Sequence, residues 1–109
     1  MAPEERERLY ERLAEEFCED PAVARGTMMG FPCLRVGGEF FASLERSRGN
    51  LIVKLSAVEV SQLIESGSAA PFAPAGRAFR EWAEIQGAEA GEWRSLMNRA
   101  RKFVQNLDS

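Results

Sequence analysis

Apolar side chains recur at helical spacing near both ends of this chain. Leu9, Leu13 and Phe17 follow one another every four residues, so the pattern predicts a helix over residues 3–18. A second helix is predicted over residues 91–107, because its apolar positions fall within about a third of the circumference at 100° per residue. These positions are Trp93, Leu96, Met97, Ala100, Phe103, Val104 and Leu107.

Between these helices the pattern changes to short apolar runs separated by turn residues. Residues 27–36 and 39–46 flank Gly37-Gly38, which suits a two-residue hairpin turn of type I′ or II′. A second turn at Ser47-Arg48-Gly49-Asn50 leads into residues 51–55. The simplest arrangement is an antiparallel meander of three strands.

The second half of the chain opens with a helix-start signal. Ser56 and Glu59 have the spacing of a capping box. In this motif the hydroxyl accepts a hydrogen bond from the backbone N–H three residues later, and the carboxylate accepts one from the backbone N–H of the serine. We therefore expect a short helix over residues 57–66, followed by a looped segment at 68–77 that contains Pro71 and Pro74. Residues 78–85 fit either a helix or a strand by propensity alone.

The first hairpin carries apolar residues on both faces. With a two-residue turn, Val36 would pair with Glu39 and Leu34 with Phe41, and opposed residues share a face. One face then holds Met29, Phe31, Cys33, Phe40, Ala42 and Leu44, and the other holds Met28, Leu34, Val36 and Phe41. A sheet with one covered face shows cleaner alternation. Either the chain's own helices or another chain covers the second face, and Leu34, Val36 and Phe41 are the candidate residues for a partner or dimer contact.

Composition fits one folded domain over residues 1–109. Hydrophobic residues make up 45% of the 109, the formal net charge is −3, and residues 1–20 alone carry eight acidic residues against three arginines. This balance gives no long-range attraction to phosphate backbones. The polar start of the chain predicts no secretory signal, and no apolar run approaches the roughly 20 residues of a membrane span.

The residue types needed for common catalytic sites are scarce. The chain has no histidine, which removes Ser-His-Asp and Cys-His pairs and the commonest general base. Cys18 and Cys33 lie 15 positions apart and match no metal or redox motif, so we interpret them as reduced thiols of a cytoplasmic protein. We expect no enzyme activity, no metal and no cofactor.

One polar stripe on the final helix could contact nucleic acid. Its members, spaced at i, i+4, i+7 and i+11, are Arg94, Asn98, Arg101 and Gln105. Arginine can bind phosphate in a bidentate manner. An ordinary solvated helix face explains the same pattern, so nucleic-acid binding is the second hypothesis here.

One series of short motifs runs along most of the chain: Met28-Met29-Gly30, Leu34-Arg35-Val36, Gly37-Gly38, Phe41-Ala42, residues 51–55, Pro71-Phe72, Gly76-Arg77 and Trp82. In this series the chain resembles the TfoX (Sxy) N-terminal domain family and, more distantly, the MmcQ/YjbR-like proteins. The resemblance spans roughly residues 5–107. Met29 and Gly37 depart from the Phe and Asp usual in the family. Full-length competence regulators that resemble this family carry a second, C-terminal domain in addition.

The resemblance implies an α+β domain of order α-β-β-β-α-β-β-α with a five-stranded, mostly antiparallel sheet, similar to secretion-chaperone-like folds. It also implies that residues 78–85 form a strand. Members are linked to regulation of competence for DNA uptake, YjbR-like members are suspected to bind nucleic acid, and no catalytic residues come with the family. We therefore expect a small interaction or regulatory module that acts through protein contacts, with a partner or as a homodimer.

Overall fold

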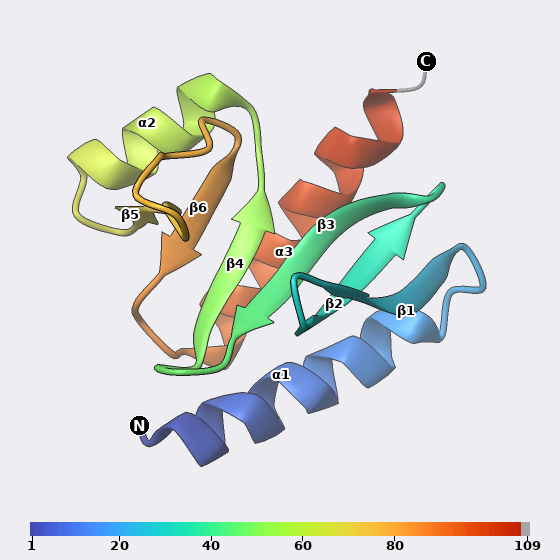
Figure 1. Ribbon diagram of the computed structural model, residues 1–109. Helices are drawn as coiled ribbons and strands as arrows, with labels where there is room; N and C mark the ends of the chain where they lie inside the picture. The colour runs from blue at the N-terminus through green and yellow to red at the C-terminus, as the bar shows by residue number, and fades with distance from the viewer. Residues whose placement is uncertain (108–109) are drawn as a thin grey trace.

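Three helices form at the three places where the sequence predicts them. The computed structural model describes residues 1–107 (Figure 1). The helices are α1 (Pro3–Cys18), α2 (Ala57–Glu65) and α3 (Ala90–Asn106). In α1, Leu9, Leu13 and Phe17 are buried as their spacing predicts. Leu107, predicted to extend the apolar stripe of α3, is instead 48% exposed beyond the helix end.

The start of α2 is fixed by only half of the predicted capping box. The Ser56 hydroxyl accepts a hydrogen bond from the Glu59 backbone N–H at 3.2 Å, which satisfies one of the free donors of the first turn. The Glu59 carboxylate does not accept from the Ser56 backbone N–H, because it forms an ion pair with Arg99 of α3. The cap defines where α2 begins, and the ion pair links α2 to α3.

The sheet is antiparallel and has six strands, in the order β1-β2-β3-β4-β6-β5. The strands are β1 (Val23–Met28), β2 (Phe31–Val36), β3 (Glu39–Glu45), β4 (Asn50–Lys54), β5 (Ala70–Pro71) and β6 (Trp82–Ile85). The predicted α+β class with an antiparallel sheet and three helices is thus confirmed. The predicted count of five strands and the order with three strands before α2 are wrong.

The extra strand is β1, most of which lies before residues 27–36, the segment predicted as one strand. The chain reverses at Met29 and Gly30, whose φ angles are 52° and 80°. Two successive residues with positive φ make a type I′ turn, so β1 and β2 form a hairpin of their own. The continuous apolar run concealed this turn, because methionine is not a residue that signals positive φ.

The segment 78–85, implied to be a strand by the family resemblance, is a strand only at Trp82–Ile85. There it pairs with β4, from Leu51 opposite Ile85 to Lys54 opposite Trp82. Residues 78–81 belong to the loop that precedes β6, where the Trp82 backbone N–H donates to the Phe79 carbonyl at 3.2 Å. The strand interpretation is therefore correct for the second half of the segment and wrong for the first.

The pairing of β2 with β3 departs from the predicted register between Arg35, which pairs with Phe40, and Leu34. Val36 pairs with Glu39 as predicted, but Leu34 pairs with Ala42 and not with Phe41. An irregularity between Leu34 and Arg35 leaves Phe41 as an additional residue on β3, which is a β-bulge. The bulge lets Phe41 and Ala42 both enter the main core.

Helices α1 and α3 pack on one face of this sheet and form the main core with it (Figure 1). The N-terminal end of α1 is tied to two strands by a polar network. Arg6 donates to the Asn50 side-chain oxygen at 3.1 Å and to the Gln86 carbonyl at 2.6 Å, and Asn50 in turn donates to Glu84 at 2.7 Å. The turn at Gly49 lies so close to Arg6 that an added Cβ would approach the Arg6 side chain to 2.9 Å. Only glycine fits this contact without a shift.

Candidate functional site

The three residues proposed as a partner contact lie inside the protein. Leu34, Val36 and Phe41 are 0%, 4% and 0% exposed and belong to the core beneath α1 and α3. The Phe41 ring packs against Phe17 of α1, with 6.0 Å between ring centroids. The chain's own helices cover this face, which was the alternative left open by the sequence. These residues are therefore not available to a second chain, and assigning them to a partner contact is wrong.

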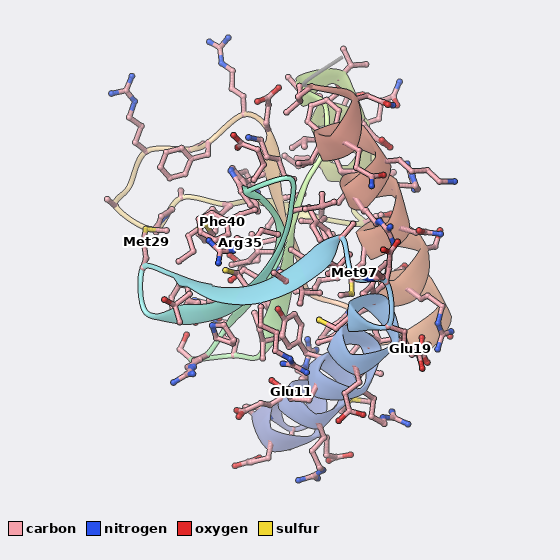
Figure 2. All side chains as sticks on the ribbon, turned by 90° about the vertical axis from the view of Figure 1, so that its right-hand side faces the viewer. Glu11, Glu19, Met29, Arg35, Phe40 and Met97 are labelled. Atoms are coloured by element: carbon pink, nitrogen blue, oxygen red, sulfur yellow. The ribbon has the colours of Figure 1, made fainter. Side chains whose placement is uncertain are left out.

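The opposite face of the sheet is covered in part by the loop before β6. Cys33, Ser43 and Ile52 point to this side and are all buried. Phe72, at the start of the loop, is 3% exposed and lies with Phe31 around one surface hollow. Figure 2 shows Met29, Arg35 and Phe40 on this side of the molecule, away from α1 and α3.

The predicted nucleic-acid stripe lies on the outer side of α3, and its two arginines face carboxylates near α1. Arg94 makes two hydrogen bonds to Glu16, at 2.9 and 3.1 Å, and Arg101 pairs with Asp20. These contacts, with a backbone N–H from Ala22 in the case of Asp20, hold the pKa of both carboxyls below their usual range. Asn98 and Gln105 are exposed. Nucleic-acid binding by this stripe stays a prediction, and both of its arginines are already paired with carboxylates of the same chain.

The two cysteines are free thiols, and the setting of Cys33 does not activate it. Cys33 is buried, and loss of solvation raises the pKa of its thiol. A raised pKa leaves little of the nucleophilic thiolate at neutral pH. Across residues 1–107, no three His, Cys, Asp or Glu side chains gather in a way that could hold a metal ion.

A groove between α2 and the segment before β6 is the best-formed surface site. It has a volume of about 650 Å³, within the range of roughly 300–1,000 Å³ typical of ligand pockets. Figure 1 shows α2 and this segment side by side at one end of the sheet. The apolar side chains along it are Ala57, Val58, Val60, Ile64, Pro71, Ala78, Phe79 and Trp82.

Two side chains in the groove are unusually exposed for their type. Val58 is 69% exposed and Phe79 is 48% exposed. Burying a large apolar side chain is worth about 1.5–3 kcal/mol, so each leaves a large free energy unrealised in the isolated chain. A groove with both side chains at its surface is therefore suited to an apolar ligand group.

The side of the groove that contains Phe79 is held in place by contacts with the buried Phe72. The Phe79 backbone N–H donates to the Phe72 carbonyl at 3.0 Å, which closes the loop between them. The buried Phe72 ring lies 6.0 Å from Phe79 and 6.5 Å from Trp82, between ring centroids. The three rings form one aromatic cluster, so Phe79 is presented on a fixed support.

A smaller lobe continues the groove on the other side of Phe79 and is more polar. It has a volume of about 430 Å³ and shares Ala57, Phe79, Arg80 and Trp82 with the main groove. Its remaining charged members are Lys54 and Glu81. The Lys54 ammonium lies 6.0 Å from the centre of the Trp82 ring, close enough for a weak cation–π contact.

The sequence reasoning missed this groove, although one signal was present. Val58 lies on the side of α2 away from Val60, Leu63 and Ile64, which lie in or pack against the core. A single exposed apolar residue is ordinary, so this signal alone does not locate a surface contact. Phe79 gave no comparable signal, because its segment fitted two structures.

Comparison with protein-family models, curated proteins and solved structures finds no match to this chain. Membership of the TfoX N-terminal domain family therefore stays a prediction from the short motifs. No helix within residues 1–107 is long and apolar enough to cross a membrane.

Proposed function

We propose that this chain is a non-enzymatic interaction module that binds another protein through the groove between α2 and the 71–82 segment. The observation that carries this proposal is the clustering of exposed apolar side chains. Five large ones are exposed in residues 1–107, and two of these, Val58 and Phe79, line the groove. Isolated exposed apolar residues are ordinary, whereas neighbouring ones in a concave site mark interaction surfaces.

Further parts of the proposal rest on the sequence. The chain is a cytoplasmic module of the TfoX N-terminal domain-like kind, with a regulatory role. The two free cysteines support a reducing compartment. The family-like segments Pro71-Phe72, Gly76-Arg77 and Trp82 all lie in or beside the groove segment, which supports a role for this segment in the function that such a family would share.

The test is retention of a partner by three forms of the immobilised protein. Wild type is compared with Val58→Asp and with Leu107→Asp, which places the same charge on an exposed apolar residue outside the groove. Both substitutions are at exposed positions, so stability should change by no more than about 0.5 kcal/mol. We expect wild type and Leu107→Asp to retain the same protein from cells, and Val58→Asp to lose it.

Two further readouts separate the alternatives. Retention that disappears after nuclease treatment would assign the binding to nucleic acid and contradict the proposal. Light scattering on the purified chain tests self-association: a homodimer that Val58→Asp dissociates and Leu107→Asp does not would identify a second copy as the protein bound. Equal retention by all three forms would show that the groove is not the binding surface.

A further inference from the structure

The charged residues around the groove restrict the chemistry of its occupant; this step rests on the proposed function. Two cations, Lys54 and Arg80, line the smaller lobe together with one acid, Glu81, while a second acid, Glu65, lies along the main groove. Arg77 follows Gly76 in the same exposed loop, three residues before Arg80. The side of the groove beyond Phe79 therefore carries more positive than negative charge.

These cations have no ion-pair partner, in contrast to four arginines elsewhere in the chain. Arg25, Arg94, Arg99 and Arg101 each pair with a carboxylate of the same chain. Within residues 1–107, no ion pair involves Lys54, Arg77 or Arg80. Positive charge left unpaired beside an exposed apolar groove complements a ligand that is both apolar and anionic.

A folded second copy of this chain does not offer such a segment from its acidic region. The most acidic stretch is residues 1–20, but the apolar side chains of α1 within it are buried in its own core. Presenting them to another copy would require α1 to detach. The matching occupant is therefore a segment of a different protein.

We propose that the groove binds an acidic amphipathic segment of a partner protein. A large apolar side chain of that segment fills the main groove against Val58 and Phe79, and a neighbouring Asp or Glu lies in the smaller lobe between Lys54 and Arg80. This division follows the helix-in-groove and acidic-motif modes of peptide recognition, in which apolar anchors supply affinity and charges set the choice of partner.

The test selects random peptides displayed on phage against the full chain. The library is first depleted on Val58→Asp, so that the peptides recovered on wild type depend on the groove. We expect the recovered peptides to combine a large apolar residue with Asp or Glu within the next few positions. One recovered peptide is then labelled, and its affinity is measured by fluorescence anisotropy.

The cationic lobe is tested with Lys54→Gln and Arg80→Gln. Each substitution should weaken the affinity for the labelled peptide about two- to fivefold, which is the range of a single exposed ion pair. The matched control is Arg46→Gln, in the exposed turn at the opposite end of β4, which should change nothing. The difference between wild type and Arg80→Gln should vanish near 1 M salt, where the screening length falls to about 3 Å.

The outcomes separate this inference from the proposed function. Groove-dependent peptides without acidic enrichment, or enriched in Lys and Arg, would overturn the inference and leave protein binding at the groove standing. Peptides that bind Arg80→Gln and Lys54→Gln as tightly as wild type would do the same. If no recovered peptide distinguishes wild type from Val58→Asp, the inference and the proposed function both fail.

Discussion

Phe41 tests whether the bulged strand β3 has been placed correctly. Its side chain is fully buried against Phe17, whereas the adjacent Phe40 lies on the opposite side of the sheet and is only partly buried (Figure 2). Replacing a buried Phe by Ala costs about 3–5 kcal/mol. Since the free energy of unfolding of small domains is about 5–15 kcal/mol, Phe41→Ala should remove a large share of it. Phe40→Ala is the matched control and should cost about 1 kcal/mol.

The assay is urea unfolding of both variants, followed by circular dichroism and tryptophan fluorescence, with the molar mass measured by light scattering. If Phe41→Ala does not fold, Phe41→Leu supplies the comparison, because a change of shape at similar volume usually costs below about 1.5 kcal/mol. The dependence of the free energy on urea should stay the same, so that shifted midpoints report stability. Equal losses at positions 40 and 41 would refute the bulge. A stable Phe41→Ala with a halved molar mass would show that Phe41 contacts a second chain.

Three other predictions follow from particular residues. Met29→Asn should stabilise the protein by about 1 kcal/mol, since Met29 has a φ of 52° and asparagine tolerates this conformation better; a destabilised variant in thermal unfolding would contradict the strained turn. Tyr10→Phe should also stabilise by about 1 kcal/mol at pH 7, because the buried phenol oxygen has no hydrogen-bond partner within residues 1–107. Burial raises the pKa of Tyr10 above its ordinary value of 10.0, so above pH 10 the unfolded chain loses the phenol proton more readily than the folded chain and the wild type loses stability. The difference in free energy of unfolding between wild type and Tyr10→Phe should therefore widen in urea titrations above pH 10. A constant difference would be evidence against this burial. If α3 binds nucleic acid, Arg94→Ala with Arg101→Ala should weaken binding equally for all DNA sequences, whereas a wild type not retained on DNA at low salt would end that hypothesis.

The parts of the fold that depend on periodicity could be predicted from the sequence. The four-residue repeat of Leu9, Leu13 and Phe17 identified α1, and Ser56 located the start of α2. Gly37-Gly38 identified a hairpin turn, whose φ angles of 60° and 82° match type I′. In each case a local property of the residues determines the local structure.

Features that arise from packing were not predictable in the same way. A methionine at positive φ does not announce a turn, so residues 27–36, which contain the end of β1 and all of β2, were predicted as one strand. The bulge at Phe41 exists because it turns a further large side chain into the core, and this gain depends on α1 being in place. Both faces of β2 and β3 are apolar in sequence, so only the tertiary structure shows which face the helices cover.

The candidate groove was even harder to predict from the sequence, because it also arises from packing. Val58 and Phe79 are 21 positions apart in the sequence, and neither belongs to a recognisable binding motif. They line one groove because α2 packs beside β6, and the Phe72 carbonyl accepts from Phe79 and holds the loop before β6. An apolar residue, Val58, on the outer side of α2 was the one local signal.

The most direct measurement of the central claim is photo-crosslinking in the native cell from a reactive amino acid placed at position 58. The same amino acid at position 107 is the control, since Leu107 is also exposed but lies outside the groove. The proposed groove predicts a protein adduct from Val58 that is absent from Leu107 and is lost when Phe79→Asp is added to the same chain. No adduct at position 58, or the same adducts from both positions, would contradict the groove as the functional surface.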